Sequence, residues 1–190
     1  MRQICCHPEL AGIKLTHRFQ SSGKLTLLQE LLDDALDGNH RILVFSQFVK
    51  MLEILAEWFQ EKKIPFVTLH GQTKNRQQTV EKFQEHHDIP IFLLSLKVGG
   101  LGLNLTSADT VILYDPWWNP AVESQAIDRV HRIGQQKNIT AYRLITQGTI
   151  EEKMLTLQTR KKQLFDSLIT AEEGIAKKLG WEDIRFLLEL

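Results

Sequence analysis

The sequence has little cysteine, no long hydrophobic run and no net charge. Its two cysteines, Cys5 and Cys6, are adjacent, and neighbouring cysteines rarely bridge each other, so we expect two free thiols in a reducing compartment. The longest apolar runs, such as Ile89–Leu96, fall well short of the roughly 20 residues that span a membrane. No charged-then-apolar leader opens the chain, so neither a secretory signal nor a membrane contact is expected.

Basic and acidic residues both number 23, so there is no overall positive charge to indicate nucleic acid, and any such contact must come from local patches. The seven histidines have no metal-ligand spacing, and we predict no metal site. What remains is an ordinary soluble composition, 43% hydrophobic and 24% charged, in a chain of 190 residues that suffices for one domain with a proper core.

Strand-like runs alternate with amphipathic stretches through most of the chain. Five runs rich in β-forming residues predict strands, at Arg41–Phe48, Pro65–His70, Ile89–Leu96, Thr110–Asp115 and Ile139–Thr146. Helical periodicity occupies residues 22–38, 49–62, 75–85 and 121–132, and a capping box of Thr149 and Glu152 opens a final helix to about Ile169. This alternation predicts an α/β fold: a doubly wound parallel sheet with helices on both faces.

Two flanks lie outside the alternation. Residues 1–20 are mixed and contain Pro8 and Gly12, as a connector would. Beyond Ala171, a short charged stretch leads to Trp181 and an apolar tail, which predicts a short helix packed back on the core. We therefore predict a connector at 1–20, an α/β domain at 21–148 and a C-terminal helical segment at 149–190.

Three glycines in four positions follow the third predicted strand, in Gly99-Gly100-Leu101-Gly102. Glycine lets the backbone approach a ligand closely or adopt positive φ. Leu105 stands where a dinucleotide-binding G-x-G-x-x-G would need its third glycine. Arg18 and Leu25 stand where a phosphate loop around Gly23-Lys24 would need glycine and serine or threonine. The glycines form either a tight structural turn or part of a ligand site without its own phosphate-cradling loop.

The helix predicted after the fourth strand carries Gln125, Arg129 and Arg132 on one face, at positions i, i+4 and i+7. Both arginines lie in its last turns, where the helix dipole favours cations, so a structural role is one interpretation. The other is an arginine finger, whose planar guanidinium stabilises charge on a transferred phosphoryl group. Asp128 and Glu123 either orient the arginines or are solvated surface charges.

An unusual hexapeptide, Asp115–Pro120, places two tryptophans between prolines at a strand end. In one interpretation a single tryptophan packs inward while the other presents a flat face for stacking on a sugar or base. In the other, both close the rim of the core. Lys97, Lys74 and Arg76 follow neighbouring strands and together would neutralise several phosphates, unless they are simply solvated.

Four strings occur in the order of motifs IV, IVa, V and VI of the SWI/SNF family of helicase-like ATPases: RILVFSQF, LHGQTKNRQ, LSLKVGGLGLNLTSAD and DPWWNPAVESQAIDRVHRIGQ. The last is long and highly specific. Over essentially all its residues the chain resembles the second lobe of such an ATPase, with the look of a prokaryotic member. The resemblance implies a RecA-like fold, and Thr149–Leu190 matches the family's helical brace.

The resemblance also assigns site residues. It implies that Arg129 and Arg132 are catalytic and reach a nucleotide held by the first lobe, with the nucleotide cleft lined by Gly100, Gly102 and Gln125. It implies DNA contacts at Lys97, Trp118, Thr73, Arg76 and Asn104. Leu96-Lys97 stands where many members have Thr-Arg, which removes a hydroxyl contact and keeps the charge.

The implied function is that of a double-stranded-DNA-dependent ATPase and translocase that remodels protein–DNA complexes. ATP and magnesium would be held mainly by the N-terminal RecA-like lobe of the same protein, which supplies the Walker lysine, the magnesium ligands and the DExH base. We therefore expect negligible ATP hydrolysis by these 190 residues alone. The expected location is intracellular: cytoplasm or nucleoid in a prokaryote, nucleus in a eukaryote. A non-catalytic DNA-binding or interaction module and a strand-separating or RNA-acting helicase remain as alternatives.

Overall fold

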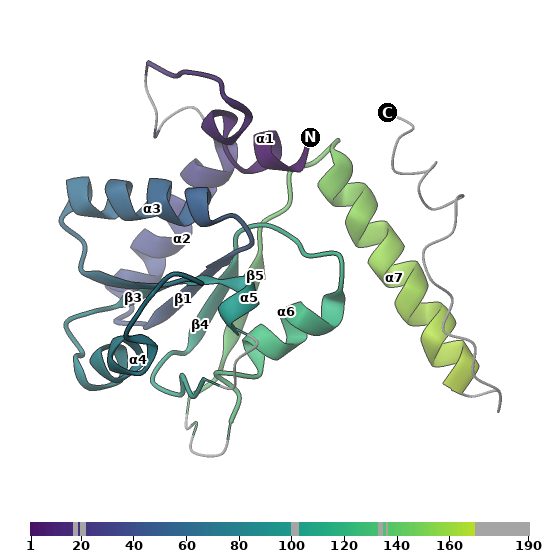
Figure 1. The fold of residues 1–190 in the computed structure, drawn as a ribbon. Coiled ribbons are helices and arrows are strands. Elements are labelled where there is room, and N and C mark those ends of the chain that lie inside the picture. The colour runs from purple at the N-terminus through teal and green to yellow at the C-terminus, as the bar shows by residue number, and fades with distance from the viewer. Residues whose placement is uncertain (17–18, 20–21, 100–102, 133–134, 136, 170–190) are drawn as a thin grey trace.

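A five-stranded parallel sheet forms the centre of the computed structural model, which describes residues 1–16, 19, 22–99, 103–132, 135 and 137–169, with side chains to residue 161 (Figure 1). The strands are β1 (Ile42–Ser46), β2 (Phe66–Leu69), β3 (Ile91–Ser95), β4 (Thr110–Leu113) and β5 (Thr140–Arg143). They lie in the order β2-β3-β1-β4-β5, and every neighbouring pair is parallel. The first strand is central and later strands are added on both sides of it, so the predicted doubly wound sheet is confirmed.

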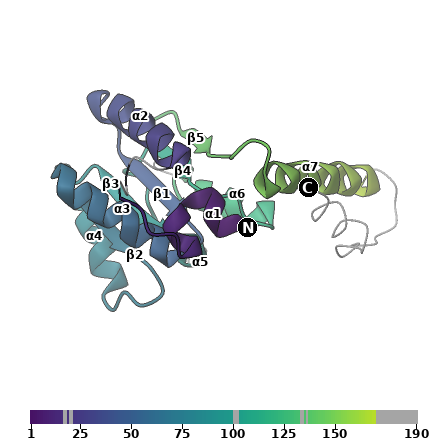
Figure 2. The same cartoon turned by 90° about the horizontal axis from the view of Figure 1, so that it is seen from above.

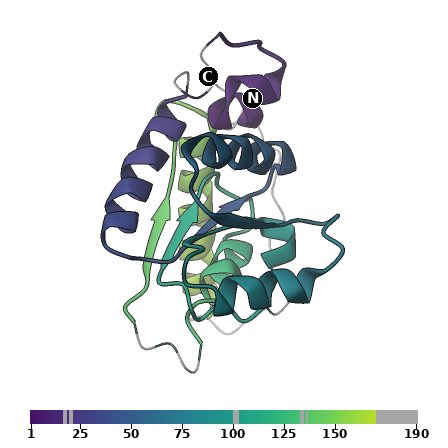
Figure 3. The ribbon, with the colours of Figure 1, turned by 90° about the vertical axis from the view of Figure 1, so that its left-hand side faces the viewer.

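Helices cover both faces of the sheet. On one face lie α2 (Gly23–Asp37) and α3 (Val49–Lys62), and on the other lie α4 (Arg76–Glu85), α5 (Leu96–Gly99) and α6 (Pro120–Ile127). Figure 3 shows α2 and α3 beside the sheet from a second direction. All five residues of β1 and all five of β3 are buried, as expected for strands covered on both sides. The four residues of the edge strand β5 are exposed.

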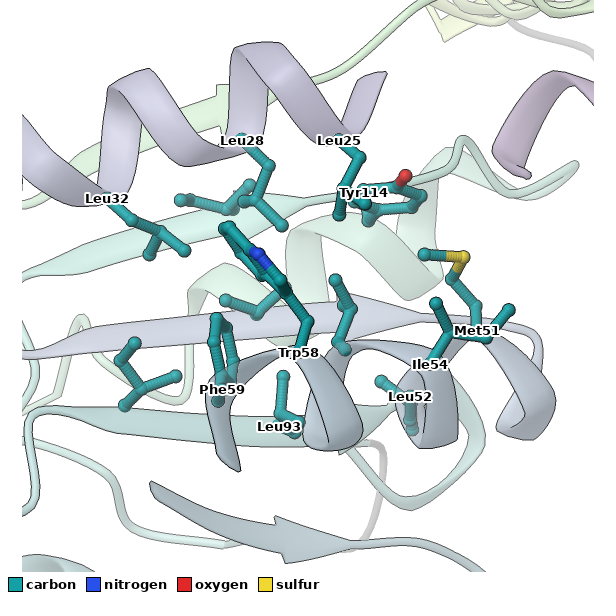
Figure 4. Close-up of a cluster of buried hydrophobic side chains, with 14 of the residues drawn as sticks. Leu25, Leu28, Leu32, Met51, Leu52, Ile54, Trp58, Phe59, Leu93 and Tyr114 are labelled. Atoms are coloured by element: carbon teal, nitrogen blue, oxygen red, sulfur yellow. The ribbon is translucent and has the colours of Figure 1, made fainter. Parts of the chain in front are cut away.

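Alternate residues of each central strand face different helices. Val44 belongs to the cluster formed with α2 and α3, whereas its neighbour Phe45 belongs to the cluster formed with α4, α5 and α6. Figure 4 shows the first cluster, in which leucines of α2 and the larger side chains of α3 meet over the sheet. The apolar positions in these helices recur at helical spacing, and this is why the sequence predicted the helices.

Both flanks contain helices. Residues 1–20 contain α1 (Arg2–Cys6) and a 3-10 turn, η1 (Pro8–Ala11). The helix α7 (Ile150–Ile169) projects away from the sheet domain (Figure 2). Its start is capped by the Thr149 hydroxyl, which accepts from the Glu151 N–H at 3.2 Å, whereas the Glu152 carboxylate accepts from Gly148 at 2.9 Å and not from Thr149. The predicted domain boundaries near residues 20 and 148 remain predictions.

One predicted helix is shorter than its sequence pattern. Helix α6 ends at Ile127 and not at Arg132, so the prediction that Gln125, Arg129 and Arg132 share a helical face is wrong. Beyond Ile127 some backbone hydrogen bonds span fewer residues than the four of an α-helix. The Arg129 N–H donates to the Ala126 carbonyl at 3.4 Å, and the Arg132 N–H donates to the Val130 carbonyl at 3.0 Å. The Arg129 carbonyl instead accepts from the backbone N–H of Leu105 at 3.1 Å, which is a tertiary contact that helical periodicity does not encode.

Within the described residues, no helix has the length and apolarity needed to cross a membrane. Cys5 is half-buried and Cys6 buried, and both are free thiols, as predicted.

Candidate functional site

The carboxyl ends of the parallel strands meet at one edge of the sheet, where the loop after β4 is firmly fixed. We call this loop, Asp115–Asn119, the tryptophan loop. Asp115 is fully buried: its carboxylate accepts from the Ser46 hydroxyl at 2.5 Å and from the Gln47 backbone N–H at 3.2 Å. Burial raises the pKa of Asp115, while the hydrogen bonds from Ser46 and Gln47 oppose that rise. The end of β1 therefore holds the start of the tryptophan loop.

The two tryptophans point to different environments. Trp117 is half-buried against the cluster under α4, α5 and α6, whereas Trp118 is 38% exposed. One tryptophan therefore packs inward and the other is partly exposed, while stacking of Trp118 on a sugar or base remains a prediction. The backbone N–H of Trp117 donates to the Glu123 carboxylate at 2.6 Å, and the backbone carbonyl of Trp117 accepts from the side-chain amide of Gln158 in α7.

Glu123, in the first turn of α6, neither orients the two candidate arginines nor faces solvent. It is buried, and its second carboxylate oxygen pairs with the Arg143 guanidinium of β5 at 2.5 Å. A carboxylate in the first helical turn also suits the helix dipole. Glu123 therefore connects α6, β5 and the tryptophan loop, a role that only the tertiary structure reveals.

Three further residues proposed to bind DNA follow the neighbouring strands β2 and β3 at the same edge. The Thr73 hydroxyl accepts from the His70 N–H at 3.1 Å, and the Arg76 guanidinium donates to the Gly71 carbonyl at 3.0 Å. These bonds fix the turn that enters α4. Lys97 is exposed on α5 directly after β3. Hydroxyl and cationic groups at one sheet edge are the contact types that position a nucleic-acid backbone.

Asn104 lies elsewhere, toward the amino ends of the strands. Its carbonyl accepts from the Gln84 side chain at 2.7 Å, in the last turn of α4, which runs back from the carboxyl edge. The next residue, Leu105, donates to Arg129 at 3.1 Å, and the Gln135 amide donates to Ala108 at 2.8 Å. The segment 103–108 and the turn that carries the arginines are therefore one hydrogen-bonded unit, separate from the tryptophan loop.

The residues proposed to face the nucleotide differ in how far they are buried. Arg129 is half-buried, and its Nε is shielded from solvent without a hydrogen-bond partner among the described residues. Arg132 and Gln125 are exposed. Gly100 and Gly102 lie outside the described residues. Guanidinium groups are donors only, so this turn suits phosphate oxygens and not a metal ion. No group of three His, Cys, Asp or Glu side chains in the described ranges is placed to hold a metal.

Several residues that shape the site gave no signal in the sequence. Arg2 of α1 donates to the Pro116 carbonyl at 2.6 Å, and Lys24 of α2 donates to the Tyr114 carbonyl at 3.0 Å. The Lys24 ammonium also pairs with Glu151 of α7 at 2.6 Å, and both side chains are buried. Charged residues near helix ends usually face water, so only the packing of α1, α2 and α7 around the loop shows these contacts.

The fold and these contacts define a class of protein, and comparison with known families names it. Residues 23–134 match the family model described as the helicase conserved C-terminal domain. The chain belongs to this family. Its described structure, with the tryptophan loop and the arginine turn on one parallel sheet, lies largely within that match.

Solved structures narrow the class to the C-terminal RecA-like lobe of SWI/SNF-type ATPases. The C-terminal domain of the Sulfolobus solfataricus SWI2/SNF2 ATPase is 32% identical, with a TM-score of 0.72, and the match covers all of this chain and 78% of that one. The Sulfolobus solfataricus ATPase core in complex with double-stranded DNA is 36% identical, with a TM-score of 0.76, over all of this chain and 40% of that one. The predicted RecA-like fold is confirmed.

A curated relative has a more specific name. The chromatin-remodeling ATPase INO80 of Debaryomyces hansenii is 43% identical over 159 residues, which are 83% of this chain. The chain spans only 12% of the length of that relative. Fungal and archaeal proteins thus both match, and the prokaryotic source remains a prediction.

Proposed function

We propose that the chain is the second motor lobe of a double-stranded-DNA-dependent ATPase and translocase that remodels protein–DNA complexes. The observation that carries the proposal is the separation of two groups on one rigid sheet. Lys97, Trp118 and the Thr73–Arg76 turn lie at the carboxyl edge, while Arg129 and Arg132 lie in a turn beyond α6. A lobe with two such faces can respond to a nucleotide on one face while it holds DNA on the other.

In this proposal Arg129 and Arg132 are the catalytic residues. Their guanidinium groups donate to the charge that builds on a transferring phosphoryl group, which ATP with magnesium supplies from the N-terminal lobe of the same protein. Gln125, Gly100 and Gly102 line the same cleft. The hydrogen bond from Leu105 to the Arg129 carbonyl supports the assignment, because it holds the turn in place before the lobes close.

DNA contact is proposed at the other face. Lys97, Arg76 and Thr73 would bind backbone phosphates, and Trp118 would stack on the tracked strand. Asn104 lies apart from these residues, beside the arginine turn, and would make a separate DNA contact. Two relatives support a role with DNA. The Sulfolobus ATPase core was solved with double-stranded DNA, and the INO80 relative is named a chromatin-remodeling ATPase. Alternate closing and reopening of two DNA-bound lobes would move the motor along the duplex.

The arginine assignment is tested in a protein that contains both lobes. Arg129→Ala and Arg132→Ala are each expected to lower kcat for DNA-stimulated ATP hydrolysis by about 10³-fold, the order of loss seen when an arginine finger is removed. Arg160→Ala changes an exposed arginine of α7 and is the matched control, expected to stay near wild type. Unchanged ATPase activity in both variants would show that the arginines are not catalytic.

The 190 residues alone are expected to hydrolyse ATP negligibly, because their sequence contains no phosphate loop. Phosphate release is measured with saturating duplex DNA, and robust DNA-stimulated turnover would refute the division of labour between lobes. A non-catalytic DNA-binding module would also be inactive alone, but would stay inactive when joined to an N-terminal lobe. Greater stimulation by single-stranded nucleic acid than by duplex would favour a strand-separating or RNA-acting helicase. The intracellular location remains a prediction.

A further inference from the structure

The exposed tryptophan of the site lies against a residue from the far N-terminal end of the chain. The Arg2 guanidinium carbon is 5.8 Å from the centroid of the Trp118 ring, within the range of a cation–π contact. The same guanidinium donates to the Pro116 carbonyl at 2.6 Å. Arg2 thus contacts the tryptophan loop twice, once at its backbone and once at the ring face of Trp118.

Helix α1 presents Arg2 from a fixed position. The Tyr114 hydroxyl donates to the Cys6 carbonyl at 3.0 Å, and the Ser22 hydroxyl donates to the same oxygen at 3.2 Å. Tyr114, Cys6 and Ser22 are all buried. The last residue of α1 is therefore anchored to the end of β4 and the start of α2, which leaves Arg2, one helical turn earlier, little freedom to move relative to the loop.

The tryptophan loop itself is fixed up to Trp117, but not beyond it by the same contacts. Glu123 and Gln158 hold the N–H and the carbonyl of Trp117, and Ser46 and Gln47 hold Asp115. These bonds set the backbone before Trp118 and leave the direction of its exposed indole to other contacts. The planar guanidinium of Arg2 is suited to this, since it can donate at its edge and stack with its face.

We propose that Arg2 is a positioning residue that orients the Trp118 indole for DNA. The inference rests on the proposed function, because that proposal gives Trp118 its DNA contact. Arg2 is half-buried and already donates within the protein, so it acts through Trp118 and not as a phosphate ligand itself. Burial lowers the pKa of Arg2 and the Asp115 charge raises it, but arginine remains a cation at neutral pH.

The first measurement reads the position of Trp118 without DNA. The 190-residue chain is labelled with 5-fluorotryptophan, and the Trp118 resonance is assigned through Trp118→Phe. Arg2→Ala is expected to shift this ¹⁹F resonance, and Arg2→Lys to shift it as well, because an ammonium keeps the charge and loses the flat stacking face. Gln3→Ala, which changes an exposed neighbour on α1, is the matched control and should leave the resonance in place. An unchanged resonance in Arg2→Ala overturns the inference.

The second measurement reads DNA affinity in the ATPase that contains both lobes. Arg2→Ala is expected to raise the duplex concentration that half-saturates ATP hydrolysis by about threefold to tenfold, with kcat at saturating DNA and KM for ATP unchanged. In a Trp118→Ala background, Arg2→Ala should cause no additional change, because the residue through which it acts is gone.

Failure of the positioning role of Arg2 and failure of the proposed DNA contact of Trp118 give different results. If Arg2→Ala weakens DNA binding equally with and without Trp118, and lowers the salt dependence by about one counterion as loss of a phosphate contact does, Arg2 binds DNA directly and the positioning role is wrong. Lys14→Ala removes one charge from the same N-terminal segment and calibrates the general electrostatic effect. If Trp118→Ala alone leaves DNA affinity unchanged, the proposed DNA contact of Trp118 fails, while the ¹⁹F shift still tests whether Arg2 orients the ring.

Discussion

The two ends of strand β4 carry the same residue type in opposite electrostatic settings. Asp109 directly precedes the strand, Asp115 follows it by two residues, and both carboxylates are buried. At Asp109, burial works to raise the pKa, but hydrogen bonds from Lys137 and Thr110 and the charges of Lys137 and His40 lower it overall. At Asp115, burial prevails and the pKa is raised.

The difference lies in the charge of the partners. Lys137 places its ammonium 2.8 Å from the Asp109 carboxylate. The donors nearest to Asp115 are neutral, a hydroxyl and a backbone amide, and Lys24, whose charge lowers the pKa of Asp115, is already paired with Glu151 at 2.6 Å. Burial therefore costs a carboxylate more when its partners are neutral than when one of them is a cation.

The two ends also serve different parts of the molecule. The amino end joins loops of the sheet domain: Asp109 contacts His40, Arg41 and Lys137. The carboxyl end joins the tryptophan loop to the helices at both ends of the described chain, since Tyr114 contacts Cys6 of α1 and Lys24, which itself pairs with α7. Damage at the amino end should lower stability and leave the tryptophan loop in place, whereas damage at the carboxyl end should also disturb that loop.

The largest expected effect is at the carboxyl end. Lys24→Met leaves the Glu151 carboxylate buried without its cation and should lower the free energy of unfolding by about 3–5 kcal/mol, as measured by urea denaturation. Lys24→Met combined with Glu151→Gln removes both charges and should lose less than the sum of the two single changes. Additive losses, or a loss below about 1 kcal/mol in Lys24→Met, would mean that the pair is not a coupled anchor.

A smaller effect separates the two aspartates. Asp109→Asn should cost about 2 kcal/mol near neutral pH, because a charge-assisted hydrogen bond is lost, and Asp115→Asn about 1 kcal/mol, because its partners are neutral. The pH dependence of stability separates the two aspartates more clearly than the size of these losses does. The stabilisation from Asp109, whose folded pKa is lowered, is present above its ordinary value near 4 and is lost as the pH falls through the folded pKa.

For Asp115, whose folded pKa is raised, the sign is reversed: stability is lost as the pH rises from the ordinary value through the folded pKa. The advantage of the wild type over Asp109→Asn should therefore grow as the pH rises from 3 to 6, whereas its advantage over Asp115→Asn should shrink. Unfolding free energies at a series of pH values check both slopes, and slopes of the same sign would refute the contrast. Lys137→Met should flatten the Asp109 slope and leave the Asp115 slope unchanged.

Most of the fold was predictable because it depends on local pattern. The five strands were found since buried parallel strands are apolar throughout, and α2 and α3 were found since their apolar residues recur with helical period. The end of α6 was not predicted, because residues 128–132 keep helical spacing while their backbone bonds to residue 105. The short helix α5 was also missed, because its four residues are too few to show a period.

For the candidate site too, local sequence predicted some features and missed others. The sequence placed Lys97, Trp118, Arg129 and Arg132 among the candidates, and its motif strings indicated the family that the comparisons confirm. They could not show that Glu123 is buried against Arg143, or that Arg2 reaches the tryptophan loop, 114 residues away in sequence at Pro116. Such pairings depend on which helix ends meet, and sequence spacing contains no information on that.

The sequence by itself determined the α/β class, the five strands, the longer helices and the family, because hydrophobic periodicity and specific strings are local properties. The tertiary structure alone decided how the two aspartates beside β4 ionise, where α6 ends and which buried charges hold the tryptophan loop. The physical reason is that burial and pairing act on free energy only through neighbours in space, and for Asp115, Lys24 and Arg2 those neighbours come from distant parts of the chain.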